Sequence, residues 1–199
     1  MSAALEPGTW ADVAIVGGGA AGLSAALFLA RAQRRVVVFD AGRPRIAAVT
    51  HIHELLGSEN TTPDDFLAHA RNETVGYGAE IRNEEVVSVE PRPDGRFDVH
   101  SVDTSTTAGA VVLATGLVDV LPDIPGLTEL WGRDVHVCPC FSGHEVRNAR
   151  IIVMGIAEQL TRQPTPRRRP HRNRPTPRGR RSLHFNTPAG TIPSRRNTL

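Results

Sequence analysis

The feature that most constrains the fold is a glycine-rich turn between a buried strand and a helix. The run "VAIV" at Val13–Val16 is typical of a buried strand, and "GGGAAG" follows it. Residues 23–33 have a helical composition with leucine and alanine along one side, and "RVVVFD" at 35–40 predicts a second buried strand. These elements form one βαβ unit, so we expect a parallel sheet with a right-handed crossover.

The turn fits the pattern G-x-G-x-x-G and ends in a helix, as a dinucleotide site requires. The first glycine permits the tight turn, the second lets a pyrophosphate approach the backbone, and the third lets the helix pack closely on the strand. The phosphates would lie on free N–H groups at the helix N-terminus, and the acid ending the next strand would bind the adenosine ribose. The context favours this site over a glycine turn without a ligand. Its predicted residues are Gly17, Gly18, Gly19, Ala20, Ala21, Gly22 and Asp40.

The rest of the chain up to residue 155 extends the same fold class. Residues 63–78 predict a helix that begins with a proline and two aspartates, which suit its first turn. Residues 79–102 alternate around the turn "PDG" and predict a β-hairpin. Residues 109–116 and 149–155 predict buried strands, the latter being the last strand that we expect. The prediction is an α/β, Rossmann-type half-domain over residues 10–155.

Composition places the chain in a cytoplasmic class. No apolar run approaches the roughly 20 residues that a membrane span needs. The first ten residues carry no basic cluster, so they do not resemble a secretory signal. Two cysteines alone, one residue apart, make no extracellular disulfide framework.

The charge is divided sharply along the chain. All 21 acidic residues lie at or before Glu158, whereas residues 159–199 hold 11 of the 23 arginines and no acid. The prolines and arginines from 160 onward predict a disordered basic tail. Three origins are open: a shifted reading frame in a GC-rich gene, a basic arm that binds nucleic acid through phosphates, or a solvated linker. Each of them leaves a segment that attracts polyanions non-specifically.

Several stretches resemble thioredoxin-reductase-like flavoproteins, over about residues 10–160 in all. They are "DAGRPR", "HIHELLG", "DDFLAHAR", "VVLATG", "LPDIPGL" and "CPCFSGHEVRNARIIVMG", in the order and spacing of that family. In the family the first glycine motif binds FAD and a second, inserted Rossmann domain binds NADPH. The resemblance implies that Gly17–Gly22 and Asp40 hold the adenosine diphosphate half of FAD. It also places Ala114, Thr115 and Gly116 against the flavin nucleotide and the backbone near Val87 at the adenine.

The chain departs from the family pattern in three places. Ile46 stands where asparagine is frequent, and Glu54 stands where glycine is frequent. The family's redox pair is C-x-x-C, but here Cys138 is followed by Cys140, and Phe141 takes the second cysteine's position. Cys138 and Cys140 are the candidate redox residues, and a disulfide between them would be strained and easily reduced. Unpaired inert thiols and metal binding are the alternatives, although two cysteines make a poor zinc site.

Several histidines are candidates for a functional role, but none of them completes a known metal-binding motif. The stretch "HELLG" is not H-E-x-x-H, because Gly57 replaces the second histidine, so no metal site is predicted there. The resemblance places His51 and His53 near the flavin, while the plainer interpretation is a pair of solvated or hydrogen-bonded loop histidines. His136 and His144 flank the cysteines and could tune a thiolate.

The family's reaction passes electrons from NADPH to FAD and then to a dithiol, so the resemblance implies a disulfide substrate and a homodimer. After "IIVMG" only Gly155 remains of a second nucleotide loop, and prolines soon end any helix. We therefore expect a truncated enzyme that binds FAD weakly or not at all and cannot complete the cycle. The alternative function is a non-enzymatic nucleotide-binding remnant whose basic tail associates with nucleic acid.

Overall fold

A computed structural model describes residues 10–136, 142–154 and 181–185 of the chain. The described residues belong to two units. The first is drawn from Met1–Ala47 and Pro63–Asp119, and the second from Ala48–Thr62 and Val120–Arg196. Within the described residues, no helix is both long enough and apolar enough to span a lipid bilayer.

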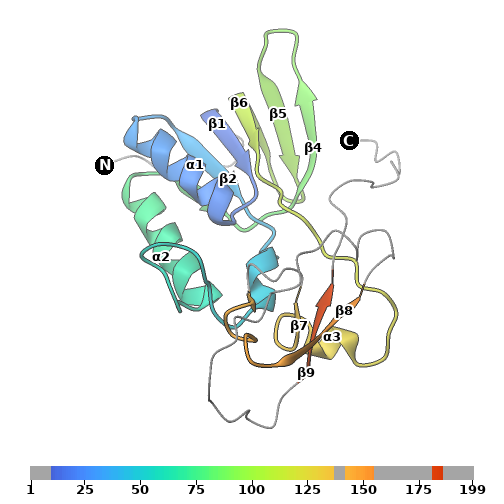
Figure 1. The fold of residues 1–199 in the computed structure, drawn as a ribbon. Coiled ribbons are helices and arrows are strands. Elements are labelled where there is room, and N and C mark those ends of the chain that lie inside the picture. Colours follow the sequence, from blue (N-terminus) through green and yellow to red (C-terminus); the bar gives the residue numbers. More distant parts are fainter. Residues whose placement is uncertain (1–9, 137–141, 155–180, 186–199) are drawn as a thin grey trace. The chain divides into compact units, whose positions relative to one another are not determined.

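The first unit is built on a six-stranded sheet (Figure 1). Its order is β3-β2-β1-β6-β5-β4, and the strands are β1 (Ala11–Val16), β2 (Val36–Phe39), β3 (Glu80–Arg82), β4 (Val86–Pro91), β5 (Phe97–Ser101) and β6 (Ser105–Leu113). β1 pairs in parallel with β2 and β6, and β2 pairs in parallel with β3. The predicted βαβ unit and parallel sheet are therefore confirmed.

Helices α1 (Ala20–Arg31) and α2 (Pro63–Gly76) pack against each other beside this sheet, and a short 3-10 turn, η1 (Arg45–Ala48), follows β2 (Figure 1). α2 begins at the proline that the sequence predicted as its first residue. Val36 and Val38 of β2 pack in a cluster with Ala26 and Ala30 of α1. The helical face of the sheet is thus filled by small and β-branched side chains.

The opposite face of the parallel strands is covered by the predicted hairpin. β4 and β5 pair antiparallel, and β5 pairs antiparallel with the first half of β6. Val37 and Phe39 share a cluster with Val99 of β5 and Ala108 of β6. Because neighbouring side chains on a strand point to opposite faces, β2 needs an unbroken apolar run to be buried on both sides.

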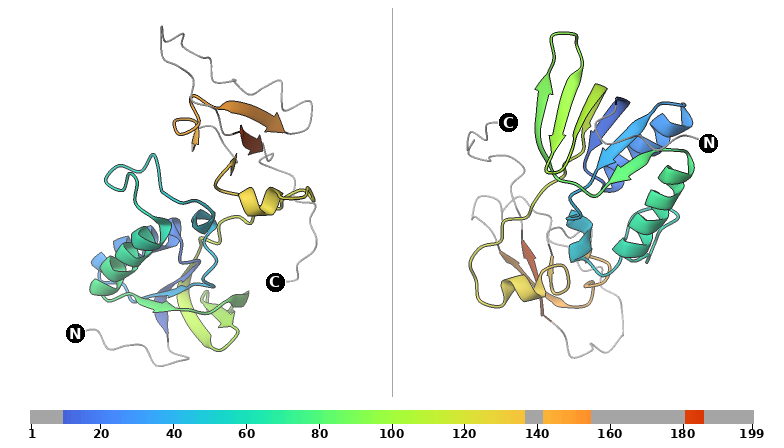
Figure 2. Two further views of the ribbon diagram at one scale, coloured as in Figure 1. Left: turned by 90° about the horizontal axis from the view of Figure 1, so that it is seen from below. Right: turned by 180° about the vertical axis from the view of Figure 1, so that it is seen from behind.

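The second unit holds helix α3 (Leu127–Leu130) and three strands that lie side by side (Figure 2). The strand order is β7-β9-β8, all parallel, with bounds β7 (Val135–His136), β8 (Arg150–Met154) and β9 (Arg181–Phe185). Leu127 and Val135 form its core with Trp131 and Met154 packed against them.

Strand β9 differs from the sequence prediction. Residues 181–185 fall inside the predicted disordered tail, and β8 was expected to be the last strand. Five residues with only two large apolar side chains, Leu183 and Phe185, give a weak local signal. The strand forms by pairing with β7 and β8, which lie far away in the sequence. The other residues of the predicted tail lie outside the described residues.

Candidate functional site: the glycine turn after β1

The turn between β1 and α1 can be made only with glycine at two positions. Gly17 has φ +113°, a backbone conformation that residues with a side chain rarely adopt. Its N–H donates to the carbonyl oxygen of Phe39 at 2.8 Å. A Cβ atom at position 17 would also overlap the backbone of Ala114. A Cβ atom at Gly22 would overlap the carbonyl oxygen of Gly17. The turn therefore holds helix α1 close against the strand ends.

The middle of the turn is open. Gly19 caps α1 with φ −79°, and a Cβ atom built there would have no atom within 4 Å. Ala20 and Ala21, the first two helical residues, are exposed. The first N–H groups of an α-helix have no partner within the helix and lie at its positive end. This region can accept an anionic group, since no side chain of the described residues lies within 4 Å of a Cβ atom built at Gly19.

Asp40 follows β2 at the same end of the sheet and is only 7% exposed. One carboxylate oxygen, Oδ1, accepts the N–H of Gly42 at 2.9 Å. The other, Oδ2, accepts a hydrogen bond from Nη2 of Arg71 on α2 and forms an ion pair with it. Gly18 abuts the same carboxylate, because a Cβ atom there would overlap it. Sequence reasoning found the acid but not Arg71, which lies 31 residues away on another element.

The other predicted cofactor residues are distributed around this edge. Ala114 lies beside the glycine turn, and its N–H donates to Val16 at 2.8 Å. Thr115 and Gly116 are exposed, and Gly116 has φ +69°. Val87 lies on β4 and is 54% exposed. The structure therefore brings Ala114 to the glycine turn, which is a relation that the sequence alone does not show.

Two ion pairs in the first unit tie neighbouring loops at this edge. Arg43, three residues after Asp40, pairs with Glu85 just before β4 at 2.5 Å. Arg45 binds Asp119 through two hydrogen bonds of 2.8 and 2.7 Å, which joins the segment after β2 to the segment after β6. Bidentate arginine–carboxylate pairs have a fixed geometry. The loops that follow β2 and β6 are thereby held at one end of the sheet.

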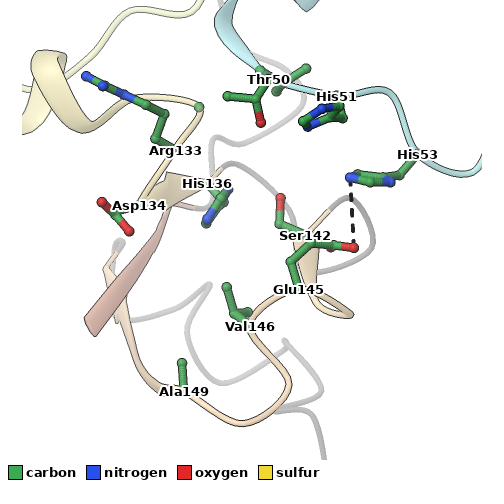
Figure 3. A pocket seen from close by; sticks show the side chains of 12 residues that line it. Thr50, His51, His53, Arg133, Asp134, His136, Ser142, Glu145, Val146 and Ala149 are labelled. Atoms are coloured by element: carbon green, nitrogen blue, oxygen red, sulfur yellow. Dashed lines mark ion pairs between the residues drawn. The ribbon is translucent and has the colours of Figure 1, made fainter. Parts of the chain in front are cut away.

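The second unit contains a cavity of about 270 Å³ lined by polar side chains (Figure 3). Its labelled residues include His51, His53, His136, Ser142 and Glu145. His53 lies between two carboxylates, with Nδ1 2.7 Å from Glu59 and Nε2 3.8 Å from Glu145. His53 is thus a hydrogen-bonded loop histidine. Among the described residues, no three His, Cys, Asp or Glu side chains are grouped to hold a metal ion.

The predicted redox pair, Cys138 and Cys140, lies outside the described residues. The segments on either side of it do line the cavity, since His136 precedes it and Ser142 follows it. Burial lowers the pKa of His136, and the charges of Asp134 and Glu145 oppose this. The neutral imidazole of His136 is therefore favoured.

Comparison with known proteins decides the family. The model of the pyridine nucleotide-disulphide oxidoreductase family matches residues 11–157, most of the chain. This chain belongs to the pyridine nucleotide-disulphide oxidoreductase family. Thioredoxin reductase tcpT of Claviceps purpurea is 38% identical over 151 residues, which cover 73% of this chain and 46% of that protein.

Solved structures of other proteins share the fold. The crystal structure of HlmI matches with a TM-score of 0.70 and 43% identity over 77% of this chain and 49% of that chain. A putative thioredoxin reductase of Bacillus anthracis matches with a TM-score of 0.72 and 29% identity, over 75% of this chain and 51% of that chain. This oxidoreductase-family chain thus spans about half the length of the relatives it matches.

Members of this family that resemble thioredoxin reductase use FAD and NADPH. The glycine turn fits the diphosphate of such a cofactor, because Gly19 is open and stands at a helix N-terminus. Asp40 fits the adenosine ribose, since each of its oxygens has a second acceptor site beyond its one described hydrogen bond. The predicted NADPH loop would begin after β8, and residues 155–180 lie outside the described residues.

Proposed function

We propose that this chain supplies the FAD-binding part of a thioredoxin-reductase-type oxidoreductase. The observation that carries the proposal is the convergence of the Gly17–Gly22 turn, the N-terminus of α1 and Asp40 at one end of the sheet. In this arrangement the diphosphate lies over Gly19 and the adenosine ribose meets Asp40.

The flavin half of the cofactor would extend from the diphosphate along the end of β6. Ala114, Thr115 and Gly116 directly follow that strand, with Ala114 beside the turn and the other two exposed, and they are the residues proposed to border the flavin nucleotide. When bound, the flavin supplies reversible two-electron transfer between a nicotinamide and a dithiol. The chain's residues contribute binding and orientation to this chemistry.

The substrate class follows from the family rather than from a described thiol. We propose a protein or small-molecule disulfide, reduced through Cys138 and Cys140 with NADPH as the electron source. The two cysteines are separated by a single proline, so a disulfide between them would have a high reduction potential. We expect this chain alone to bind FAD weakly and to show no turnover with NADPH and a disulfide.

The test is a titration of the full chain with ADP, FAD and FMN, followed by calorimetry. FMN lacks the adenosine monophosphate group of FAD and keeps a single phosphate, so it serves as the matched control ligand. The proposal predicts that ADP and FAD bind with one site per chain and that FMN does not. A chain that binds FMN as well as FAD, or binds neither ADP nor FAD, contradicts the proposed site.

A further inference from the structure

Arg71 makes contacts that its place on a surface helix does not require. It lies in α2, and its side chain is 30% exposed while that of Asp40 is 9% exposed. Its Nη2 binds Oδ2 of Asp40, and its Nη1 lies 3.4 Å from Oδ1 of Asn83, just after β3. The guanidinium therefore spans from α2 to the residues that follow two neighbouring strands.

The contacts fix the orientation of the Asp40 carboxylate. The N–H of Gly42, two residues further along the chain, donates a hydrogen bond to Oδ1, and Nη2 of Arg71 on α2 donates one to Oδ2. Gly18 closes the space beside the carboxylate. With one oxygen held on each side, the carboxylate cannot rotate without losing a hydrogen bond. A carboxylate fixed in this way pays less conformational entropy when a ribose binds to it.

The Arg71–Asp40 ion pair also affects how the carboxylate can accept hydrogen bonds from a ligand. A carboxylate buried without a partner is strongly disfavoured, and Arg71 supplies the partner of the buried Asp40 carboxylate. Each oxygen keeps a second acceptor site that can receive a hydroxyl hydrogen. A charged acceptor makes a stronger hydrogen bond to a ribose hydroxyl than a neutral one does.

We propose that Arg71 is a positioning residue that holds the Asp40 carboxylate in the orientation that reads the adenosine 2′-hydroxyl. This inference rests on the proposed nucleotide site, and it adds a residue from α2 that the glycine motif does not include. Arg71 acts through Asp40 and need not touch the nucleotide.

The experiment compares ADP with 2′-deoxy-ADP, which differ only in the hydroxyl at issue, on the full chain at constant salt. We expect wild-type chain to bind ADP about tenfold more tightly than 2′-deoxy-ADP, as a hydrogen bond to a charged group implies. Arg71→Gln should reduce that ratio to about twofold, and Arg71→Lys should keep an intermediate ratio because it retains the charge. Arg31→Gln, on α1, is the matched control and should keep the wild-type ratio.

The ratio separates positioning from a purely structural role. A variant that only loosens the fold weakens both ligands equally, so an unchanged ratio in Arg71→Gln overturns the inference while leaving the nucleotide site intact. Wild-type chain that binds neither ligand overturns the proposed function instead. Should Arg71→Gln fail to fold, the Arg71→Lys ratio decides. Lysine keeps the charge but has one nitrogen where the guanidinium uses two, for Asp40 and for Asn83, so an intermediate ratio is expected and a full wild-type ratio overturns the inference.

Discussion

The carbonyl oxygen of Gly17 occupies the space that a side chain at position 22 would need. This close approach joins the start of the turn to the first helical turn of α1. It explains why the two outer glycines serve the fold, while Gly19, which has open space beside it, is available to a ligand.

The two kinds of glycine should respond differently to substitution. Gly22→Ala should lower the free energy of unfolding by about 1–3 kcal/mol, because the new methyl group overlaps backbone. Gly19→Ala should leave stability nearly unchanged but weaken ADP binding, because the methyl group stands where the diphosphate approaches. Urea unfolding and ADP titration on both variants measure this; equal stability loss in the two would contradict the assignment.

The Arg45–Asp119 pair should contribute a small coupling between the two loops that it joins. The arginine side chain is 40% exposed and the aspartate side chain 14%, so solvent screens the interaction. A double-mutant cycle with Arg45→Ala and Asp119→Ala should give a coupling of about 0.5–1 kcal/mol, in the upper range for exposed pairs because the contact is bidentate. A coupling near zero at low salt would show that the loops are held by other contacts.

Glu84 should make the first unit acid-sensitive. Burial alone would raise the pKa of Glu84, but hydrogen bonds from Ser101 and Thr104 and the charge of Arg82 together lower it below the ordinary 4.5. Between the lowered value and 4.5 the unfolded chain binds the proton that the folded chain does not. Stability from Glu84 is thus present above pH 4.5 and is lost as the pH falls below it.

Thermal unfolding at a series of pH values checks this expectation. Glu84→Gln should flatten the decline of the melting temperature between about pH 5 and pH 3. The exposed Glu73→Gln on α2 serves as the control and should follow the wild-type curve. A Glu84→Gln curve that parallels the wild-type curve would contradict the prediction.

His136 should make stability depend on pH as well, in a higher pH range than Glu84 does. Burial lowers the pKa of His136 below the ordinary 6.5. At pH values between the lowered pKa and 6.5, His136 therefore binds a proton more readily in the unfolded chain than in the folded chain. Its contribution to stability is complete above pH 6.5 and falls as the pH drops toward the lowered value. His136→Gln should remove this part of the pH dependence between about pH 7 and pH 5, as measured by urea unfolding. If stability fell more steeply with decreasing pH in the variant than in the wild type, the charges of Asp134 and Glu145 would raise the pKa of His136 by more than burial lowers it.

The local parts of the fold could be predicted from the sequence. The βαβ unit depends on short-range signals: a β-branched run, a glycine turn and an amphipathic helix. α2 begins at Pro63 because proline suits the first helical position, and the hairpin follows from alternation around "PDG".

The relations between distant residues could not be predicted. The sequence pointed to Asp40, but its partner Arg71 comes from α2, and no periodicity links the two. Arg45 and Asp119 are 74 residues apart. Strand β9 depends on pairing with β7 and β8, and its own five residues carry little strand signal. In each case side chains or strands meet only through the tertiary fold.

A nucleotide should bind at the glycine turn, and the competing location is the basic segment with its 11 arginines over residues 159–199. Amide chemical shifts of the isotopically labelled full chain, recorded during titration with ADP, locate the ligand directly. The account predicts that the largest shift changes fall on Gly18–Gly22 and Asp40 and saturate at one ADP per chain. Changes confined to residues 159–199, without saturation, would contradict it.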